Sequence, residues 1–192
     1  MTQSRSRLRA EDWENAALEV IAEAGVGGVA VESLARRLGV TKGSFYWHFA
    51  NRNALVTAAL SRWESTEMDA FVEGPLAEGQ TDRTARARLR EILLGALSDY
   101  RSHFIFSALF ADAHDELVQP VIERVSQRRM DYLARAFEEI GLQSDDASHR
   151  ARLAYTAYVG FLLQSRHFRS ARLKEEELSG YLEHVIGTLV PV

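Results

Sequence analysis

The chain has 192 residues, of which 46% are hydrophobic and 26% charged, with a net charge of −4 and no cysteine. A chain of this length can bury a substantial core. The absence of cysteine excludes disulfides and thiolate metal sites. The negative net charge argues against a protein that coats nucleic acid without selectivity. No basic, apolar leader opens the chain and no uncharged apolar run reaches about 18 residues, so we expect a cytoplasmic protein without a membrane segment.

Charge is distributed unevenly along the chain. Residues 1–52 carry seven Lys and Arg against six Asp and Glu, whereas residues 53–192 carry 16 against 21. This pattern fits a head that contacts phosphate and a body that does not, although an acidic body is also simply a soluble surface. We therefore expect a boundary between a head of residues 1–52 and a body of residues 53–192.

The N-terminal region begins with a basic segment and a first helix. Residues 1–9 hold three arginines without apolar periodicity, and they are either an arm that reaches DNA or merely a mobile terminus. The next segment predicts a helix from about Ala10 to Ala24, which Gly25 ends. Its inward stripe consists of Trp13, Ala16, Ala17, Val20 and Ile21.

The segment from Val31 to Arg52 predicts a helix-turn-helix. Leu34, Ala35 and Leu38 follow helical spacing, and Gly39 can adopt the left-handed conformation that ends a helix. A second helix is expected over Lys42–Phe49, with the Thr41 hydroxyl as its cap. Phe45 and Phe49 would face inward, which leaves polar and aromatic groups outward that suit phosphate oxygens and base edges. These are Lys42, Ser44, Tyr46, Trp47 and His48.

Over residues 10–55 the chain resembles the TetR family of transcriptional regulators. The residues that carry the resemblance are Gly25, Leu34-Ala35, Leu38-Gly39-Val40, Thr41-Lys42-Gly43-Ser44, Tyr46, His48-Phe49, Arg52 and Leu55. The chain departs from the family pattern at Ala30, where a hydroxyl cap is usual, and at Arg52, where lysine is usual. Members of the family are homodimeric all-α proteins in which a ligand in the C-terminal bundle changes the spacing of two DNA-reading heads.

The resemblance implies a helix-turn-helix DNA-binding domain over residues 1–52 and a ligand-binding and dimerisation domain over residues 53–192. Within the head we expect roles in DNA binding for eight residues. Thr41, Tyr46, His48 and Arg52 are expected to position the head on the phosphates of a double-stranded DNA operator. Lys42, Gly43, Ser44 and Trp47 are expected to approach base edges, with Gly43 letting the backbone come near.

The body predicts a bundle that brings the total to about nine helices. A long helix from Arg52 to Phe71, capped by Asn51, would couple head and body, and Glu73–Asp82 reads as a linker. The remaining helices are expected at Arg83–Tyr100, His103–Ala111, Glu116–Ile140, Ala147–Phe168 and Glu175–Leu189. The start of the third of these is open, because Pro120 is tolerated only in a first turn. No segment shows the alternation of a strand, so the fold class is all-α.

The last two helices carry a broad apolar stripe. It includes Leu178, Tyr181, Leu182, Val185, Ile186 and Leu189, together with the small residues Ala154, Ala157 and Gly160. Physical reasoning alone allows either packing within the chain or dimerisation. The family resemblance implies the dimer, as a four-helix bundle made of two helices from each subunit.

Aromatic residues of the middle helices are candidates for an effector pocket, although an aromatic at helical spacing is also ordinary core. The candidates are Trp63, Phe71, Tyr100, His103, Phe104, Phe106, Phe110, Tyr132, Tyr155 and Tyr158. The effector would be a small, mostly apolar molecule.

We expect no cofactor, no metal site and no enzymatic activity. His103, Asp112, His114 and Asp115 could suggest a metal site, but they lack compact ligand spacing and read more simply as surface polar residues. The chain has no cysteine nucleophile, no G-x-S-x-G elbow and no H-E-x-x-H pair. The alternative to a DNA-binding regulator is a helical binding or scaffold protein whose head contacts another protein.

Overall fold

The protein is all-helical in the part of the chain that its structure, a computed structural model, describes, namely residues 8–76, 85–98, 100–168 and 175–190. Within these ranges the side chains of residues 68–76, 95–98, 100–103 and 175 are not described. The α-helices are α1 (Ala10–Ala24), α2 (Val31–Arg37), α3 (Lys42–Phe45), α4 (Arg52–Leu76), α5 (Ala85–Ser98), α6 (Tyr100–Ala111), α7 (Gln119–Glu139), α8 (Ser144–His167) and α9 (Glu175–Leu189), and a short 3-10 helix η1 covers Val26–Gly28. The prediction of an all-α fold with about nine helices is confirmed.

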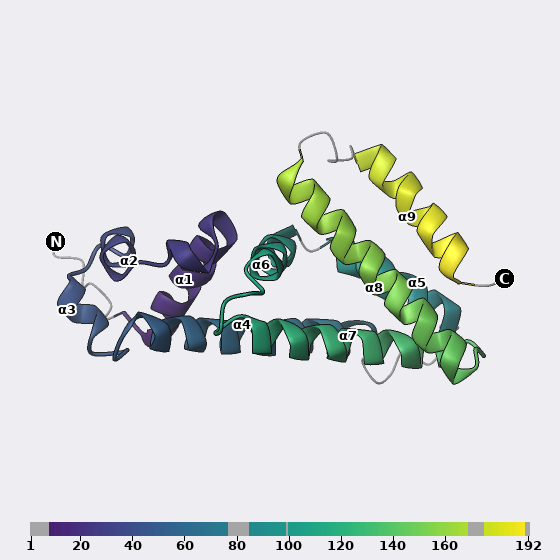
Figure 1. Ribbon diagram of the computed structural model, residues 1–192, viewed down its shortest axis with the longest axis horizontal. Helices are drawn as coiled ribbons and strands as arrows, with labels where there is room; N and C mark the ends of the chain where they lie inside the picture. Colours follow the sequence, from purple (N-terminus) through teal and green to yellow (C-terminus); the bar gives the residue numbers. More distant parts are fainter. Residues whose placement is uncertain (1–7, 77–84, 99, 169–174, 191–192) are drawn as a thin grey trace, which may run out of the picture.

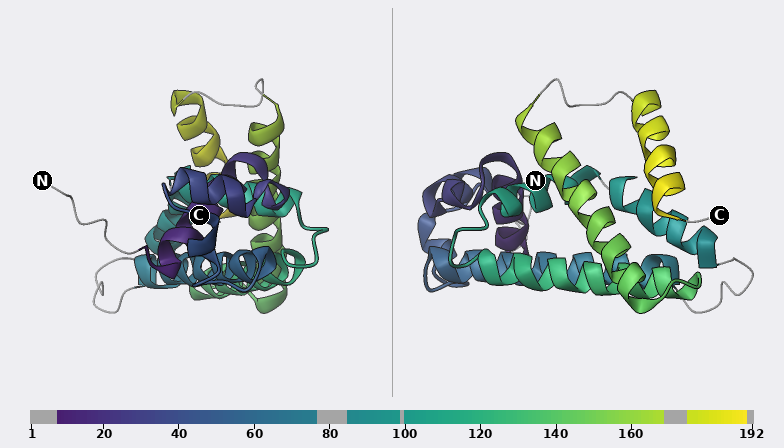
Figure 2. Two further views of the ribbon diagram at one scale, coloured as in Figure 1. Left: turned by 90° about the vertical axis from the view of Figure 1, so that its left-hand side faces the viewer. Right: turned by 45° about the vertical axis from the view of Figure 1, so that its right-hand side comes forward.

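The helices form an elongated molecule with a small head at one end (Figure 1). The head consists of α1, α2 and α3, and α4 runs from it along one edge of the molecule, with α7 beside it in both Figure 1 and Figure 2. Helix α6 lies between the head and the rest of the body. Helices α8 and α9 lie toward the opposite end, so that α3 and α9 are far apart (Figure 1).

Most predicted boundaries agree with the structure to within three residues, and the main differences lie in three regions: α4, the starts of α6 and α7, and the helix-turn-helix. Helix α4 continues to Leu76, so the first four residues of the predicted linker are helical; residues 77–82 of that linker lie outside the described part. Gly74 and Pro75 do not break α4, because it ends one residue later and they disturb only its last turn. Helix α6 begins at Tyr100 rather than His103, and α7 begins at Gln119 with Pro120 in its first turn.

The third difference is the helix-turn-helix itself. Helix α3 is regular only over Lys42–Phe45, and the chain continues as a turn in which the amides of His48 and Phe49 both donate to the Phe45 carbonyl. Thr41 is the N-cap residue, but its side chain makes no capping hydrogen bond, so the predicted hydroxyl cap is wrong. Gly39 has the predicted positive φ of 68°.

The head has its own aromatic core. Trp13 of α1 and Phe45 of α3 are both fully buried, with ring centroids 5.4 Å apart in an edge-to-face arrangement. Phe49 stacks on Phe45 at 5.7 Å. These large rings lock the short α3 onto α1, because aromatic pairs add to the free energy of burial. The short helix is therefore held by packing rather than by its own hydrogen bonds.

Polar contacts tie α4 to both parts of the molecule. The Asn51 side chain accepts from the Ala54 amide at 2.9 Å, which confirms the predicted cap. Further along α4, Arg62 pairs with Glu14 of α1 at 2.6 Å. Glu64 accepts two hydrogen bonds from Arg124 of α7, at 2.7 and 3.0 Å. Near its middle, α4 is therefore bonded to α1 and, two residues later, to α7.

Candidate nucleic-acid interface

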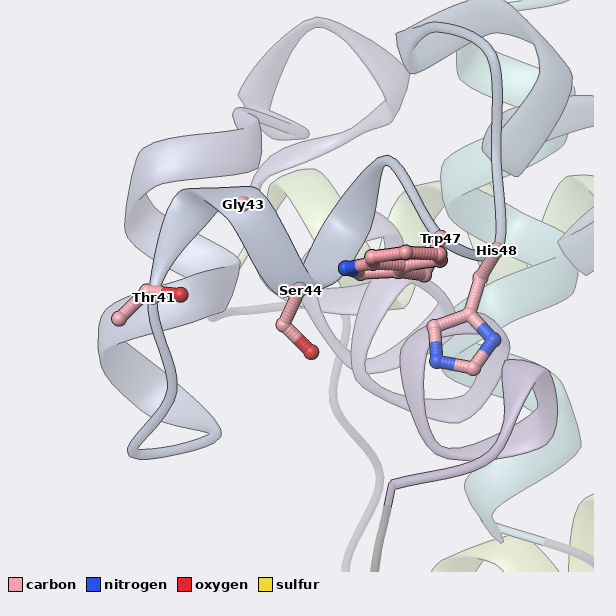
Figure 3. A pocket seen from close by; sticks show the side chains of 5 residues that line it. All are labelled: Thr41, Gly43, Ser44, Trp47 and His48. Carbon is pink, nitrogen blue, oxygen red and sulfur yellow. The ribbon is translucent and has the colours of Figure 1, made fainter.

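The outer face of α3 and the following turn forms a shallow hollow of about 330 Å³ at the head end of the molecule. The side chains and backbone around it come from Thr41, Gly43, Ser44, Trp47 and His48 (Figure 3). Five of the eight predicted DNA-binding residues therefore meet at one place. Their groups are two hydroxyls, an indole, an imidazole and an exposed stretch of backbone, which together suit phosphate oxygens and base edges.

Two aromatic side chains of this face are unusually exposed. Trp47 is 82% exposed and Tyr46 is 56% exposed. Tyr46 rests edge-on against the buried Phe45 ring at 5.2 Å, so its position is fixed although its surface is open. A folded protein rarely leaves large aromatic groups in water without a binding role, because their burial against a partner is strongly favourable. Two adjacent exposed aromatic side chains make this face a candidate contact surface.

Lys42 is charged and close to the hollow, but it already has a partner. Its Nζ forms an ion pair with Glu32 of α2, and both side chains are at least half exposed. The hydrogen bond and the charge of Lys42 lower the pKa of Glu32, and those of Glu32 raise the pKa of Lys42. Since the pair is exposed, it exchanges readily with water or with another anion such as a phosphate.

Arg52 lies under the head rather than on its outer face. Its Nε donates to the Val29 carbonyl at 2.8 Å, and its guanidinium also bonds the Val26 carbonyl. A third bond reaches the Asn53 side chain at 3.2 Å. The guanidinium thus ties the start of α4 to the connection between α1 and α2. Arg52 is separate from the group of residues that lines the hollow.

Of the cations of α2, Arg37 is bound within the head. It pairs with Glu23 of α1 at 2.8 Å and lies 3.7 Å from Glu19. The hydrogen bond from Arg37 lowers the pKa of Glu23. The pair joins α1 to α2, so this arginine stabilises the head whether or not it meets a ligand.

The comparison with known families agrees with this geometry. Residues 15–59, which run from α1 through the helix-turn-helix into α4, match the family of bacterial regulatory proteins called the tetR family. Residues 15–59 of the chain thus form a domain of the tetR family.

Curated relatives are similar to part of the chain. The chain is 38% identical over 98 residues to the class A tetracycline repressor protein of Escherichia coli, which covers 50% of this chain and 40% of that protein. It is 41% identical over 56 residues to the HTH-type transcriptional regulator SrpR of Pseudomonas putida, covering 29% and 26%. The chain thus aligns with less than half the length of these curated relatives.

Solved structures extend the likeness of fold over the whole chain. A TetR transcriptional regulator from Legionella pneumophila superposes with a TM-score of 0.78 at 16% identity, covering 97% of this chain and all of the other. A transcriptional regulator from Rhodococcus sp. Rha1 gives a TM-score of 0.77 at 20% identity, covering 95% and 96%. At these identities the likeness concerns the fold alone. The fold of the body, as well as that of the head, is therefore similar to the fold of these solved structures.

The body of the protein brings together four of the predicted ligand-binding aromatics. The buried Phe106 of α6 lies at their centre, with ring centroids 6.3 Å from Trp63, 5.8 Å from Phe110 and 5.8 Å from Tyr158. Burial raises the pKa of Tyr158 to about 12, so its hydroxyl stays protonated at neutral pH. Helices α4, α6 and α8 each contribute to this cluster.

The other predicted ligand-binding residues are more scattered. Tyr155 donates to the Ser126 hydroxyl at 2.7 Å, and burial raises its pKa. Tyr132 is buried beside α5, where burial and the charge of Glu139 raise its pKa to about 12. Phe104 is partly buried, and its carbonyl accepts from Arg166 at 3.4 Å. The side chains of Phe71, Tyr100 and His103 lie outside the described part of the chain.

Two charged residues of the cluster were missed by sequence reasoning. Arg129 of α7 is only 6% exposed, lies 4.5 Å above the Phe106 ring and forms an ion pair with Glu67 of α4, which is 9% exposed. No local motif marks them, since each sits among other charged residues on its helix. Glu67 does lie four residues after Trp63, on the same face of α4, and this spacing was the available signal.

Among the described residues no three potential ligands gather into a metal site. Asp112 and Asp115, two of the residues considered for one, accept backbone hydrogen bonds from Val26 at 2.7 Å and Leu117 at 2.8 Å respectively. The same part of the chain also contains no helix that combines the length and the apolar character needed to cross a bilayer.

Proposed function

We propose that the chain is a homodimeric transcriptional regulator, most simply a repressor, that binds a near-palindromic DNA operator through its head and leaves it when a small, mostly apolar effector binds the body. The observation that carries the proposal is the exposed face of α3, where Tyr46 and Trp47 stand out beside a hollow rich in hydrogen-bonding groups. The protein acts in the cytoplasm and catalyses no reaction. One relative is named a tetracycline repressor, which supports the direction of control.

The residues of the head divide by the contacts they can make. Tyr46, Thr41 and His48 hold phosphates, while Ser44, Trp47 and the backbone at Gly43 approach base edges. A Cβ built on Gly43 meets only the Thr41 hydroxyl, at 3.7 Å, so the space outside it is open to a groove of DNA. Lys42 exchanges Glu32 for an acceptor on DNA. Arg52 does not contact DNA directly; its guanidinium, at the start of α4, holds the head in place by its hydrogen bond to the Val29 carbonyl.

Apolar surface on α8 and α9 supports the dimer. Leu153 of α8 is 58% exposed and Tyr181 of α9 is 36% exposed, and Tyr181 stacks on Phe161 at 5.7 Å. A second copy of the chain covers these groups in a twofold arrangement. The dimer then presents two α3 helices at a spacing that can match successive turns of an operator.

The coupling between effector and DNA runs through α4. This helix carries Arg52 at its start, Arg62 against α1, and Glu64 and Glu67 against α7. An effector that binds one arrangement of α4 and α7 more tightly than another shifts the population of head positions. Release of DNA follows when the favoured spacing of the heads no longer fits the operator.

The test is fluorescence anisotropy of the purified protein with DNA from upstream of its own coding region, at several salt concentrations, with scrambled DNA as competitor. Binding that withstands the competitor, with affinity that falls steeply as salt rises, supports the proposal. Tyr46→Ala is expected to weaken binding without changing the salt dependence, since the phosphate contact that is lost is an uncharged hydrogen bond. If neither this DNA nor a genome-wide selection of fragments binds specifically, the head is a protein-binding module instead.

A further inference from the structure

The cluster around Phe106 contains a buried ion pair that the packing of the core does not require. Arg129 and Glu67 are each more than nine-tenths buried, and they join α7 to α4 in the middle of an otherwise aromatic environment. Taking two charges out of water is unfavourable, and a buried ion pair often stabilises a fold less than apolar side chains of the same volume would. Such a pair is therefore a candidate for a binding role.

The two partners of this pair are held differently. The Arg129 guanidinium lies over the Phe106 ring at 4.5 Å and near the Tyr158 ring at 5.9 Å, so aromatic faces on α6 and α8 stabilise its charge. Glu67 instead stands on α4, the helix that leads to the head. If the pair separates, the cation is retained by the cluster and the carboxylate moves away with α4.

A third polar group of the cluster has no partner among the described residues. The Nε1–H of Trp63 is buried without a hydrogen-bond acceptor, although Trp63 is only 3% exposed. A buried donor without an acceptor is unfavourable, because it has lost its bond to water. Trp63 lies one turn before Glu67 on α4 and faces the same Phe106 ring as Arg129. The group that would complete this cluster is thus a hydrogen-bond acceptor.

We propose that the effector of this protein carries a carboxylate on a planar apolar frame, and that this carboxylate replaces Glu67 on Arg129 and accepts from the Trp63 indole. The apolar frame stacks among Phe106, Trp63 and Tyr158. A carboxylate fits because Arg129 already binds one at this position, and planar two-oxygen acceptors match a guanidinium. The inference rests on the proposed function, since it names the ligand class of the same body site.

The exchange also gives a physical route to the DNA. When the ligand occupies Arg129, α4 loses its buried bond to α7 and keeps the more exposed pairs of Glu64 with Arg124 and Arg128. Helix α4 can then move away from α7, which makes room for the apolar frame and shifts Arg52 with the head. A neutral or cationic ligand cannot drive this exchange, because it does not compete with Glu67 for the guanidinium.

Three probes of equal size test the ligand class: 2-naphthoate, neutral 2-naphthamide and cationic 2-naphthylmethylamine. Their binding to the full-length protein is measured by isothermal titration calorimetry at neutral pH. We expect 2-naphthoate to bind at least tenfold more tightly than the other two. Equal affinities of the three probes, or no binding of 2-naphthoate at millimolar concentration, overturn the inference.

Variants of Glu67 and Arg129 test whether these two side chains form the anion site. Glu67→Gln keeps the side-chain size but removes the competing charge, so it should tighten 2-naphthoate by about tenfold and leave 2-naphthamide unchanged. Glu64→Gln, which alters the neighbouring pair of α4 and α7 outside the aromatic cluster, is the matched control and should leave the preference for 2-naphthoate unchanged. Arg129→Gln should abolish that preference. If Glu67→Gln has no more effect than Glu64→Gln, Arg129 is not the anion site.

A parallel anisotropy measurement without probe separates this inference from the proposed function. Specific DNA binding together with no preference for 2-naphthoate overturns the ligand class and leaves the regulator intact. A preference for 2-naphthoate without specific DNA binding supports the anion site and overturns the regulator. Release of specifically bound DNA by 2-naphthoate, but not by 2-naphthamide, supports both.

Discussion

Asp112 and Arg52 bind the two sides of a single residue, Val26. The Asp112 carboxylate, at the end of α6, accepts from the Val26 amide at 2.7 Å, and the Arg52 guanidinium, at the start of α4, donates to the Val26 carbonyl. Arg166 of α8 adds a bond to the nearby Ala22 carbonyl at 3.1 Å. The connection between α1 and α2 is thus held by three helices, and the orientation of the head depends on all of them.

Removal of the Asp112 carboxylate should loosen the head. In Asp112→Ala the part-buried Val26 amide loses its acceptor, and the free energy of unfolding should fall by about 1–3 kcal/mol. Operator affinity should fall as well, because the head positions become more varied. Chemical denaturation and anisotropy measure the two effects. Asp115→Ala, which removes a bond to Leu117 within a loop, is the control and should leave operator affinity unchanged.

The variant Arg52→Lys tests whether Arg52 acts as a clamp, through its hydrogen bonds within the head, or as a contact to a DNA phosphate. A lysine keeps the positive charge but cannot bond Val26, Val29 and Asn53 together. If Arg52 acts as a clamp, Arg52→Lys should lower the melting temperature and weaken DNA binding, while the salt dependence of binding stays unchanged. Full operator affinity with a lower melting temperature would instead show that the clamp does not position the head for DNA.

The substitution Gly43→Ala tests, without disturbing the fold, whether the hollow binds DNA. A methyl group at this position touches only the Thr41 hydroxyl at an ordinary distance, and alanine favours a helix over glycine by up to about 1 kcal/mol. Gly43→Ala should therefore be as stable as the parent protein, while its operator affinity falls by at least tenfold because the methyl group stands in the groove. Anisotropy and thermal unfolding measure both. An unchanged operator affinity of Gly43→Ala would mean that the DNA does not approach the protein at Gly43.

The sequence predicted the head more completely than the body. Helix boundaries at Gly25 and Gly39 were predictable, since a positive φ favours glycine, and so was the Asn51 cap. The shortness of α3 was not, because its end depends on how the Phe45 and Phe49 rings pack against Trp13. The clamp by Arg52 was missed for a similar reason.

The site in the body was even harder to predict from the sequence, because it too depends on three-dimensional packing. Ten aromatics at helical spacing were equally plausible as core or as pocket, and only three-dimensional packing brings Phe106, Trp63 and Tyr158 together. The Arg129–Glu67 pair joins residues 62 positions apart in the sequence. A single sequence does not reveal which of many charged residues meet across such a separation.

Glu32 should limit the affinity of the head for DNA. Its pKa lies below the ordinary 4.5 because of Lys42, so the pair persists at neutral pH and is lost only as the pH falls through that lowered value. Glu32→Gln releases Lys42 without acid, and we expect operator affinity to rise by about two- to fivefold at low salt. Glu14→Gln, which breaks the pair with Arg62 away from the hollow, is the control. A rise of equal size in both variants would reflect net charge alone.

The dimer can be tested at Gly160 of α8. A Cβ at this position meets no other atom within 4 Å, so a single chain has room for a larger side chain, and the helix itself gains from the loss of glycine. In a dimer built on α8 and α9 the same side chain stands where the partner helix approaches. Gly160→Leu should therefore fold normally but elute as a monomer in size-exclusion chromatography with light scattering.

Operator affinity of this variant should fall by at least tenfold, because two half-sites are no longer held by one molecule. Ser61→Leu introduces the same side chain at an exposed position of α4 and should remain dimeric with normal affinity. A dimeric Gly160→Leu protein with full operator affinity would move the interface away from this face of α8. A monomer that still binds the full operator as tightly as the parent would separate DNA binding from dimerisation, and the twofold arrangement of heads would then have to be abandoned.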